Sequence, residues 1–287
     1  MAAPATVRSA YVRPPDPRSI LRKLYLFTYL RGWKVWASYR AQVALTMVGW
    51  LVPVFLYFLL SAFLGVSGGS LPSLDGASYL DFFVVGLAFQ GFVSNLVGML
   101  AQRIRSEQTM GTLELVFLSP TSAGGVLLYS SVFGILLNLI AAVLILGVGV
   151  GLLGVHPNVD PGVAVLATVL LAVSCTGLSL VAASFILWTK QGNPVAIFFT
   201  TFTQFFAGVL FPISVLPRAI QWLAYSVPLT FGLDALRPAL LAGATFATVA
   251  PDLGWMALYS VITLPLGLWL LGRMLRLTKE EGTVATY

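Results

Sequence analysis

Six stretches of this chain are each long and apolar enough to cross a lipid bilayer, and none of them contains an aspartate, glutamate, lysine or arginine. A membrane-spanning helix needs about 20 apolar residues, and it satisfies its own backbone polar groups within the lipid. Only 9% of the 287 residues are charged, against about 25% in soluble proteins. We therefore predict an all-α integral membrane protein with six transmembrane helices, at Ala41–Leu64, Phe82–Ala101, Gly125–Val155, Val163–Trp188, Pro194–Phe211 and Leu253–Leu271.

The basic residues are distributed unevenly between the two sides of these spans. Fourteen of the 16 lie before the first span or after the second, fourth or sixth, and only Arg218 and Arg237 lie in the opposite loops. Lysine and arginine concentrate on the cytoplasmic side of membrane proteins. We therefore expect a multi-pass protein of the cell (inner or plasma) membrane with both termini in the cytoplasm. This bias accounts for the net charge of +6 without a nucleic-acid partner.

The segment before the first span has the pattern of an amphipathic helix. Apolar residues recur at helical spacing over 18–39, and Arg31, Lys34 and Ser38 form a polar stripe between them. Such a helix, with tryptophan on one face, favours the membrane–water interface; the alternative is a solvated basic arm. The predicted organisation is a cytoplasmic arm with this interfacial helix over 1–40, a six-helix transmembrane domain over 41–272, and a cytoplasmic tail over 273–287.

The loop after the second span predicts a short amphipathic helix on the cytoplasmic side, over about 103–120. One face is apolar and the other carries Arg103, Glu107, Gly111 and Glu114, while Pro120 ends the element. Such a helix either rests on lipid headgroups or inserts into a groove of a soluble partner. Carboxylates that face away from the membrane favour the partner, because they can pair with its basic residues.

The same loop, EQTMGTLELVFLSPTS, resembles the signature loop of type-2 ATP-binding-cassette (ABC) exporter permeases. In that family the loop is the coupling helix, which docks into a cleft of the ATPase subunit. The resemblance implies this ATPase-coupling role for the matching residues, which are Glu107, Gly111, Thr112, Leu113, Glu114, Ser119 and Pro120.

A second resemblance to the family lies after the fifth span, in GVLFPISVLPRAIQWLAYSVPLTFGLDALR. Its prolines prevent one continuous helix, yet it is too apolar for a free loop. Broken helices at membrane depth are tolerated where protein covers them or where they line a cavity. In relatives this stretch forms re-entrant helices that cap the path on the outer side. We expect such helices over about 212–238, with an outer gate at Phe211, Pro212, Leu216, Pro217, Pro228 and Arg237.

No residue pattern in the chain supplies energy or catalysis. A phosphate-binding loop needs a Gly-Lys pair, and no lysine here follows a glycine. The spans carry no ionisable group of the kind that ion-coupled carriers use, and the single histidine, His156, and single cysteine, Cys175, make a metal site improbable. We therefore expect no catalytic residues, metal or cofactor on this chain. ATP and Mg²⁺ would bind a separate ABC ATPase subunit, and a second permease copy would complete a homodimer; some relatives instead pair two different permeases.

Aromatic and amide side chains alternate in the second and fifth spans, which the resemblance places beside the translocation path near the dimer axis. Aromatic walls with a few amides suit a large amphipathic substrate, although the same residues could serve helix packing or lipid contact. The candidates for the path are Phe89, Gln90, Asn95, Phe198, Phe202, Gln204 and Phe205.

These features together predict the permease subunit of an ATP-driven exporter. It would move a drug, a lipid or a lipid-linked glycan by alternating access. An ATPase-independent channel or an ion-coupled carrier is the alternative within transport, and it leaves the coupling-like loop unexplained. A membrane-embedded enzyme is disfavoured because no span carries an acid or a histidine. A subunit that only anchors partners is the remaining alternative.

Overall fold

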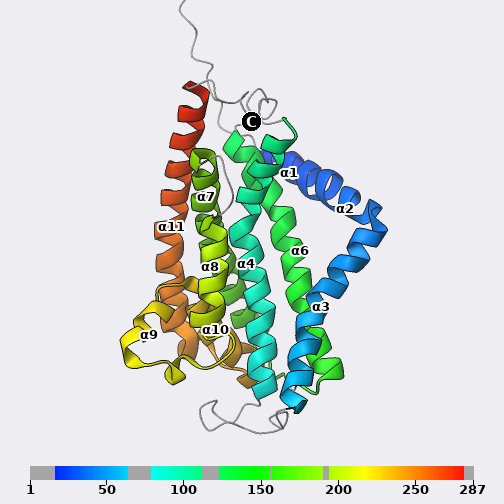
Figure 1. Cartoon of the computed structure of the whole chain (residues 1–287), viewed down its shortest axis with the longest axis vertical. Helices are drawn as coiled ribbons and strands as arrows, with labels where there is room; N and C mark the ends of the chain where they lie inside the picture. Colours follow the sequence, from blue (N-terminus) through cyan, green and yellow to red (C-terminus); the bar gives the residue numbers. More distant parts are fainter. Residues whose placement is uncertain (1–16, 64–78, 112–122, 156, 190–193, 281–287) are drawn as a thin grey trace, which may run out of the picture.

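The computed structural model of the chain describes all residues except 1–16, 64–78, 112–122, 156, 190–193 and 281–287. The described part is helical and contains no strand. Its long helices run along the long axis of the molecule (Figure 1). They are α3 (Arg40–Phe63), α4 (Tyr79–Thr109), α6 (Ala123–Leu152), α7 (Pro161–Thr189), α8 (Pro194–Phe206) and α11 (Phe246–Glu280).

Five of the described helices, α3, α4, α6, α7 and α11, are long and apolar enough to cross a membrane by length and composition. The expected fifth span is shorter than predicted, because α8 has 13 residues and ends at Phe206 rather than Phe211. Gly208 beyond its end adopts a left-handed conformation with φ of 73°, and Pro212 follows. The last span is longer than predicted, since α11 has 35 residues and begins at Phe246.

The centre of the bundle is α7, which packs against both α4 and α11. Leu171 and Cys175 of α7 are fully buried, so the single cysteine is a small core residue. On the α11 side, Ser174 Oγ lies 2.8 Å from Ser260 Oγ. Gly177 and Gly267 let the two backbones approach there, because a Cβ on Gly267 would lie 2.7 Å from the Gly177 carbonyl oxygen. Small residues and hydroxyl groups at a helix crossing are typical of membrane proteins.

The N-terminal arm is helical over the range predicted for it. It consists of α1 (Pro17–Tyr25), the π-helix η1 (Leu26–Trp33) and α2 (Lys34–Ser38), and the chain turns at Tyr39 before α3 begins. The arm lies across one end of the bundle (Figure 1) and packs on α6. Several large apolar side chains of the arm are exposed, among them Leu21, Tyr25, Tyr29, Leu30 and Trp33. An exposed aromatic face suits the predicted position at the membrane interface.

The opposite end of the bundle carries the broken helices that the prolines predict. They are the 3₁₀-helix η3 (Ile213–Val215), α9 (Arg218–Ala224), α10 (Pro228–Arg237) and the π-helix η4 (Pro238–Ala242). Pro228 occupies the first position of α10, where a missing N–H removes no intrahelical hydrogen bond. Pro238 lies where α10 continues into η4. Most of α10 is buried in contact with α4, α7 and α11. That this segment re-enters the membrane remains a prediction.

The two ends of the bundle give a direct test of the predicted topology. Cys175 is the only cysteine and is buried, so it contributes little background to thiol labelling. We expect Val159→Cys, at a 45% exposed position near η4, to react with a membrane-impermeant maleimide in intact cells. Leu277→Cys, near the end of α11 and 38% exposed, should react only after permeabilisation. The opposite pattern would reverse the inside–outside assignment.

Candidate functional site

The predicted coupling loop follows directly from α4. This helix has 31 residues and is therefore about 46 Å long at about 1.5 Å per residue, well beyond the roughly 30 Å of a hydrocarbon core. At the end of α4 beside the broken helices, the Tyr79 hydroxyl donates to the carbonyl oxygen of Leu210 at 3.0 Å. At its other end Gly111 adopts φ of 67° and its N–H donates to the Gln108 carbonyl at 3.0 Å. A single helix thus joins the chain after α8 to the start of the loop.

The last turns of α4 are tied to the N-terminal arm by an ion triad, which we define as Arg31, Arg103 and Glu107. Arg31 Nη2 lies 3.2 Å and Arg103 Nη2 3.3 Å from the same oxygen, Oε1 of Glu107. The Glu107 side chain is only 11% exposed, against 50% for Arg31 and 34% for Arg103. Charge-assisted pairs of this kind are stronger where they are partly shielded from water.

The carboxylate of Glu107 is thus mostly buried, whereas an exposed carboxylate was expected, and its role in ATPase coupling stays a prediction. Its carboxylate turns toward the arm and pairs within the chain. Helical spacing placed it on a polar face, but the spacing carries no information on the arm that covers this face. Gly111 is exposed at the end of α4. The other predicted coupling residues, Thr112, Leu113, Glu114, Ser119 and Pro120, lie outside the described residues, so their role stays a prediction.

Two of the predicted path residues lie inside the protomer. Phe89 is 3% and Gln90 8% exposed. The Gln90 side-chain amide reaches α8, where Nε2 lies 3.2 Å from Thr203 Oγ1 and 3.3 Å from the Thr200 carbonyl oxygen. Buried amides must find such partners. Gln90 therefore joins α4 to α8, and a place for it on the wall of a path remains a prediction.

The other path candidates lie at the surface of the protomer. Asn95 on α4 and Gln204 on α8 are exposed, and Phe198 and Phe205 are 70% and 52% exposed. Phe202 is half-buried and stacks on Phe198, with ring centroids 5.6 Å apart. The single chain thus presents aromatic rings and amides outward from these two helices.

At the end of the bundle opposite the arm, Arg237 of α10 links three parts of the chain. Its guanidinium lies over the Phe82 ring, 3.4 Å from the centroid, and Nη2 donates to the Gly208 carbonyl at 2.8 Å. The contact with Phe82 joins Arg237 to the start of α4. The hydrogen bond to Gly208 joins it to the chain just after α8. Gly86 leaves room for this arrangement, because a Cβ there would lie 2.7 Å from Arg237 Nη2. The sequence singled out Arg237 but not its partners.

The remaining residues of the predicted outer gate do not form one cluster by exposure. Phe211, Pro212 and Leu216 are partly buried, Pro217 is exposed, and Pro228 is buried at the start of α10. Burial, and to a lesser extent the nearby Asp252 carboxylate, raises the pKa of Asp234 on α10 to about 6, while Arg237 acts in the opposite direction. Asp234 lies one helical turn before Arg237 on α10.

Comparisons with known proteins identify the family of this chain. The sequence model of the family described as "ABC-2 type transporter" matches residues 28–241, a range that takes in the ion triad, the loop after α4 and the outer segment. The chain is 25% identical over 257 residues to Nodulation protein J of Rhizobium leguminosarum bv. viciae, covering 88% of this chain and 95% of that protein. It is 27% identical over 237 residues to Nodulation protein J of Rhizobium meliloti (strain 1021), covering 78% and 84% respectively.

Proposed function

This chain belongs to the ABC-2 type transporter family, and we propose that it is the permease subunit of an ATP-driven exporter with a separate ABC ATPase. Permeases of this family form the membrane part of ABC transporters, and the chain is accordingly a multi-pass membrane protein. The sequence contains no phosphate-binding loop, so ATP and Mg²⁺ would bind the partner. On this proposal α8 and the residues around it complete six passes, with both termini in the cytoplasm.

The observation that carries the proposal is the continuity of α4 from the outer segment to the predicted coupling loop. A helix of 31 residues moves largely as a rigid rod. A displacement of the loop by the ATPase would reach the outer end of α4, where Tyr79 contacts Leu210 and Phe82 contacts Arg237. The ion triad would make the arm move with it. On this proposal these contacts would form a physical route from ATP hydrolysis to the outer gate.

The exposed faces of α4 and α8 support a dimer of permeases. Asn95 and Gln204 are amides exposed on helices of the bundle, and amides in lipid are costly unless they find a partner or face water. A second copy of the chain would give these amides hydrogen-bond partners, and a water-filled path between the two copies would hydrate them. Aromatic rings such as Phe198 and Phe205 would form walls suited to an amphipathic drug, lipid or lipid-linked glycan. Movement of these walls would alternate access between the two sides.

The decisive experiment is to purify the chain from its native membrane in mild detergent and to identify the proteins that accompany it. We expect a stoichiometric subunit with a phosphate-binding loop, and ATP hydrolysis that depends on that subunit. The purified pair, reconstituted in vesicles, should accumulate an amphipathic probe only when ATP and Mg²⁺ are added. A matched preparation with the ATPase's phosphate-binding lysine replaced serves as the control.

Probe movement across vesicles that contain this chain alone, without any ATPase, would support the alternative of a channel or an ion-coupled carrier. In that case an imposed ion gradient, rather than ATP, should drive accumulation.

A further inference from the structure

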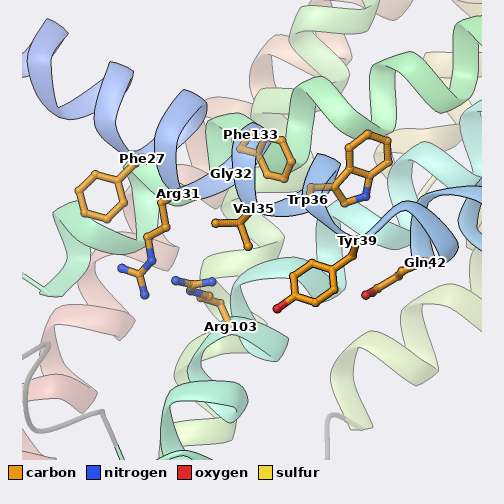
Figure 2. Close-up of a pocket in the computed structure, with 9 residues that line it drawn as sticks. All are labelled: Phe27, Arg31, Gly32, Val35, Trp36, Tyr39, Gln42, Arg103 and Phe133. Atoms are coloured by element: carbon orange, nitrogen blue, oxygen red, sulfur yellow. The ribbon is translucent and has the colours of Figure 1, made fainter.

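A cavity of about 280 Å³ opens where the N-terminal arm crosses the end of the bundle. It lies between η1 and α2 on one side and α4 and α6 on the other. Figure 2 shows the guanidinium groups of Arg31 and Arg103 side by side, with the hydroxyl end of Tyr39 turned toward them. The residues that line the cavity are Phe27, Arg31, Gly32, Val35, Trp36, Tyr39, Gln42, Arg103 and Phe133.

The side chains at this cavity carry a net positive charge, which favours binding of an anion. Arg31 and Arg103 share one oxygen of Glu107, so the ion triad carries one positive charge in excess. Each guanidinium has several N–H donors in a planar fork, and the shared oxygen satisfies only part of this set. Two neighbouring guanidinium groups also repel each other, and a second anion between them would relieve that repulsion. Arginine is the side chain best suited to bind a phosphate through two parallel hydrogen bonds.

The walls of the cavity distinguish a lipid from a small ion. Phe27, Val35 and Phe133 present apolar surface beside the two arginines, and such surface gives nothing to a free, fully hydrated anion. Helix α3, which starts next to the cavity after the turn at Tyr39, is largely exposed, with 6% of its most apolar window buried. An acyl chain could therefore run along α3 while its headgroup occupies the cavity.

The position of the cavity agrees with this chemistry. The arm exposes Tyr25, Tyr29 and Trp33, and aromatic side chains of this kind gather at the level of lipid headgroups. Anionic lipids give the cytoplasmic leaflet its negative surface potential, which attracts basic side chains. We propose that the cavity between the arm, α4 and α6 is a binding site for the phosphate headgroup of an anionic phospholipid of the inner leaflet. The site requires neither the ATPase nor a transported substrate.

Lipid retention by the purified full-length protein tests this site. Native mass spectrometry would compare bound phosphatidylglycerol with bound phosphatidylcholine after titration of each lipid in mild detergent. We expect the wild type to prefer phosphatidylglycerol. Arg31→Gln or Arg103→Gln should weaken its retention about tenfold, because each variant removes charge-assisted hydrogen bonds to the phosphate. Arg276→Gln removes an exposed basic residue of α11 away from the cavity and should leave retention unchanged.

Glu107→Gln separates binding from structural support. Among the described residues, removal of this carboxylate leaves both guanidinium groups without an ion pair. Phosphatidylglycerol should therefore bind more tightly, although the packing of the triad is weakened. A decrease in Glu107→Gln equal to that in the arginine variants would show that the triad only holds the arm in place, and would overturn the proposal. Equal retention of the two lipids by the wild type would overturn it as well. Displacement of phosphatidylglycerol by millimolar inorganic phosphate would assign the cavity to a small anion instead.

Discussion

Replacement of Glu107 by arginine is expected to reduce coupled transport by the assembled complex at least about tenfold. The variant places a third guanidinium beside Arg31 and Arg103, whose nearest nitrogens lie 3.2 and 3.3 Å from the native carboxylate. Like charges at such distances repel, and we expect the arm to separate from the end of α4 at a cost of about 1–3 kcal/mol. That range lies between the values for exposed and buried ion pairs, because Arg31 is half exposed. Transport and ATP hydrolysis in reconstituted vesicles measure the effect.

A charge swap provides the matched control for this prediction. In Arg31→Glu/Glu107→Arg the carboxylate moves to the arm and the two guanidinium groups lie on α4, so the net charge of the triad is preserved. Most of the lost transport should return in the double variant, while Arg31→Glu alone should remain impaired. If Glu107→Arg transports normally at normal expression, the triad does not link the arm to α4 in any way that matters for coupling.

Glu114 requires a separate variant, because the two carboxylates of the predicted coupling helix have different surroundings. Glu107 is paired within the chain, so a combined reversal of both charges would mix an internal defect with a docking defect. Glu114→Arg by itself addresses contact with the ATPase. On the proposed function it weakens association of the two subunits, whereas Glu107→Arg leaves association intact and uncouples hydrolysis from transport.

The features that the sequence predicted correctly are those that depend on neighbouring residues in the chain, such as helices and helix breaks. Long runs of apolar residues predicted helices at α3, α4, α6, α7 and α11, and prolines such as Pro228 predicted the breaks of the outer segment. The end of α8 differs from the prediction. The sequence stays apolar as far as Phe211, but the backbone turns at Gly208.

Contacts between distant segments could not be predicted in this way. Helical periodicity shows which residues share a face, but not which other element covers that face. Arg31 and Glu107 are 76 residues apart, and Arg237 and Phe82 are 155 apart. The sequence places Arg31 in the polar stripe of the arm and Arg237 in the outer gate. Only the fold shows that Arg31 pairs with Glu107 of α4 and that Arg237 contacts Phe82. The cavity beside Arg31 depends on the same long-range packing.

The crossing of α7 and α11 leads to the second large effect, which is on stability. A side chain at Gly267 would collide with backbone, since a Cβ there lies 2.7 Å from the Gly177 carbonyl oxygen and 2.7 Å from Leu180 Cβ. We expect Gly267→Leu to separate the two helices and to break the Ser174–Ser260 hydrogen bond. The cost should reach or exceed about 3 kcal/mol, the upper part of the range for overpacked cores. A large fall in monodisperse yield and in the thermal unfolding temperature in detergent would be the signature.

Gly272→Leu is the control for this experiment, because it lies on the same helix and a Cβ there meets nothing within 4 Å. Leucine is a better helix former than glycine by roughly 1 kcal/mol, so this variant should be as stable as the wild type or slightly more so. Both variants add the same apolar side chain to α11, and they differ only in what that side chain meets. Equal melting temperatures for the two would mean that α7 and α11 do not cross at Gly177. Helix α7 also packs against α4, which joins the predicted coupling loop to the outer gate. In that case a crossing of α7 and α11 at Gly177 would not be what holds α7 in place against α4.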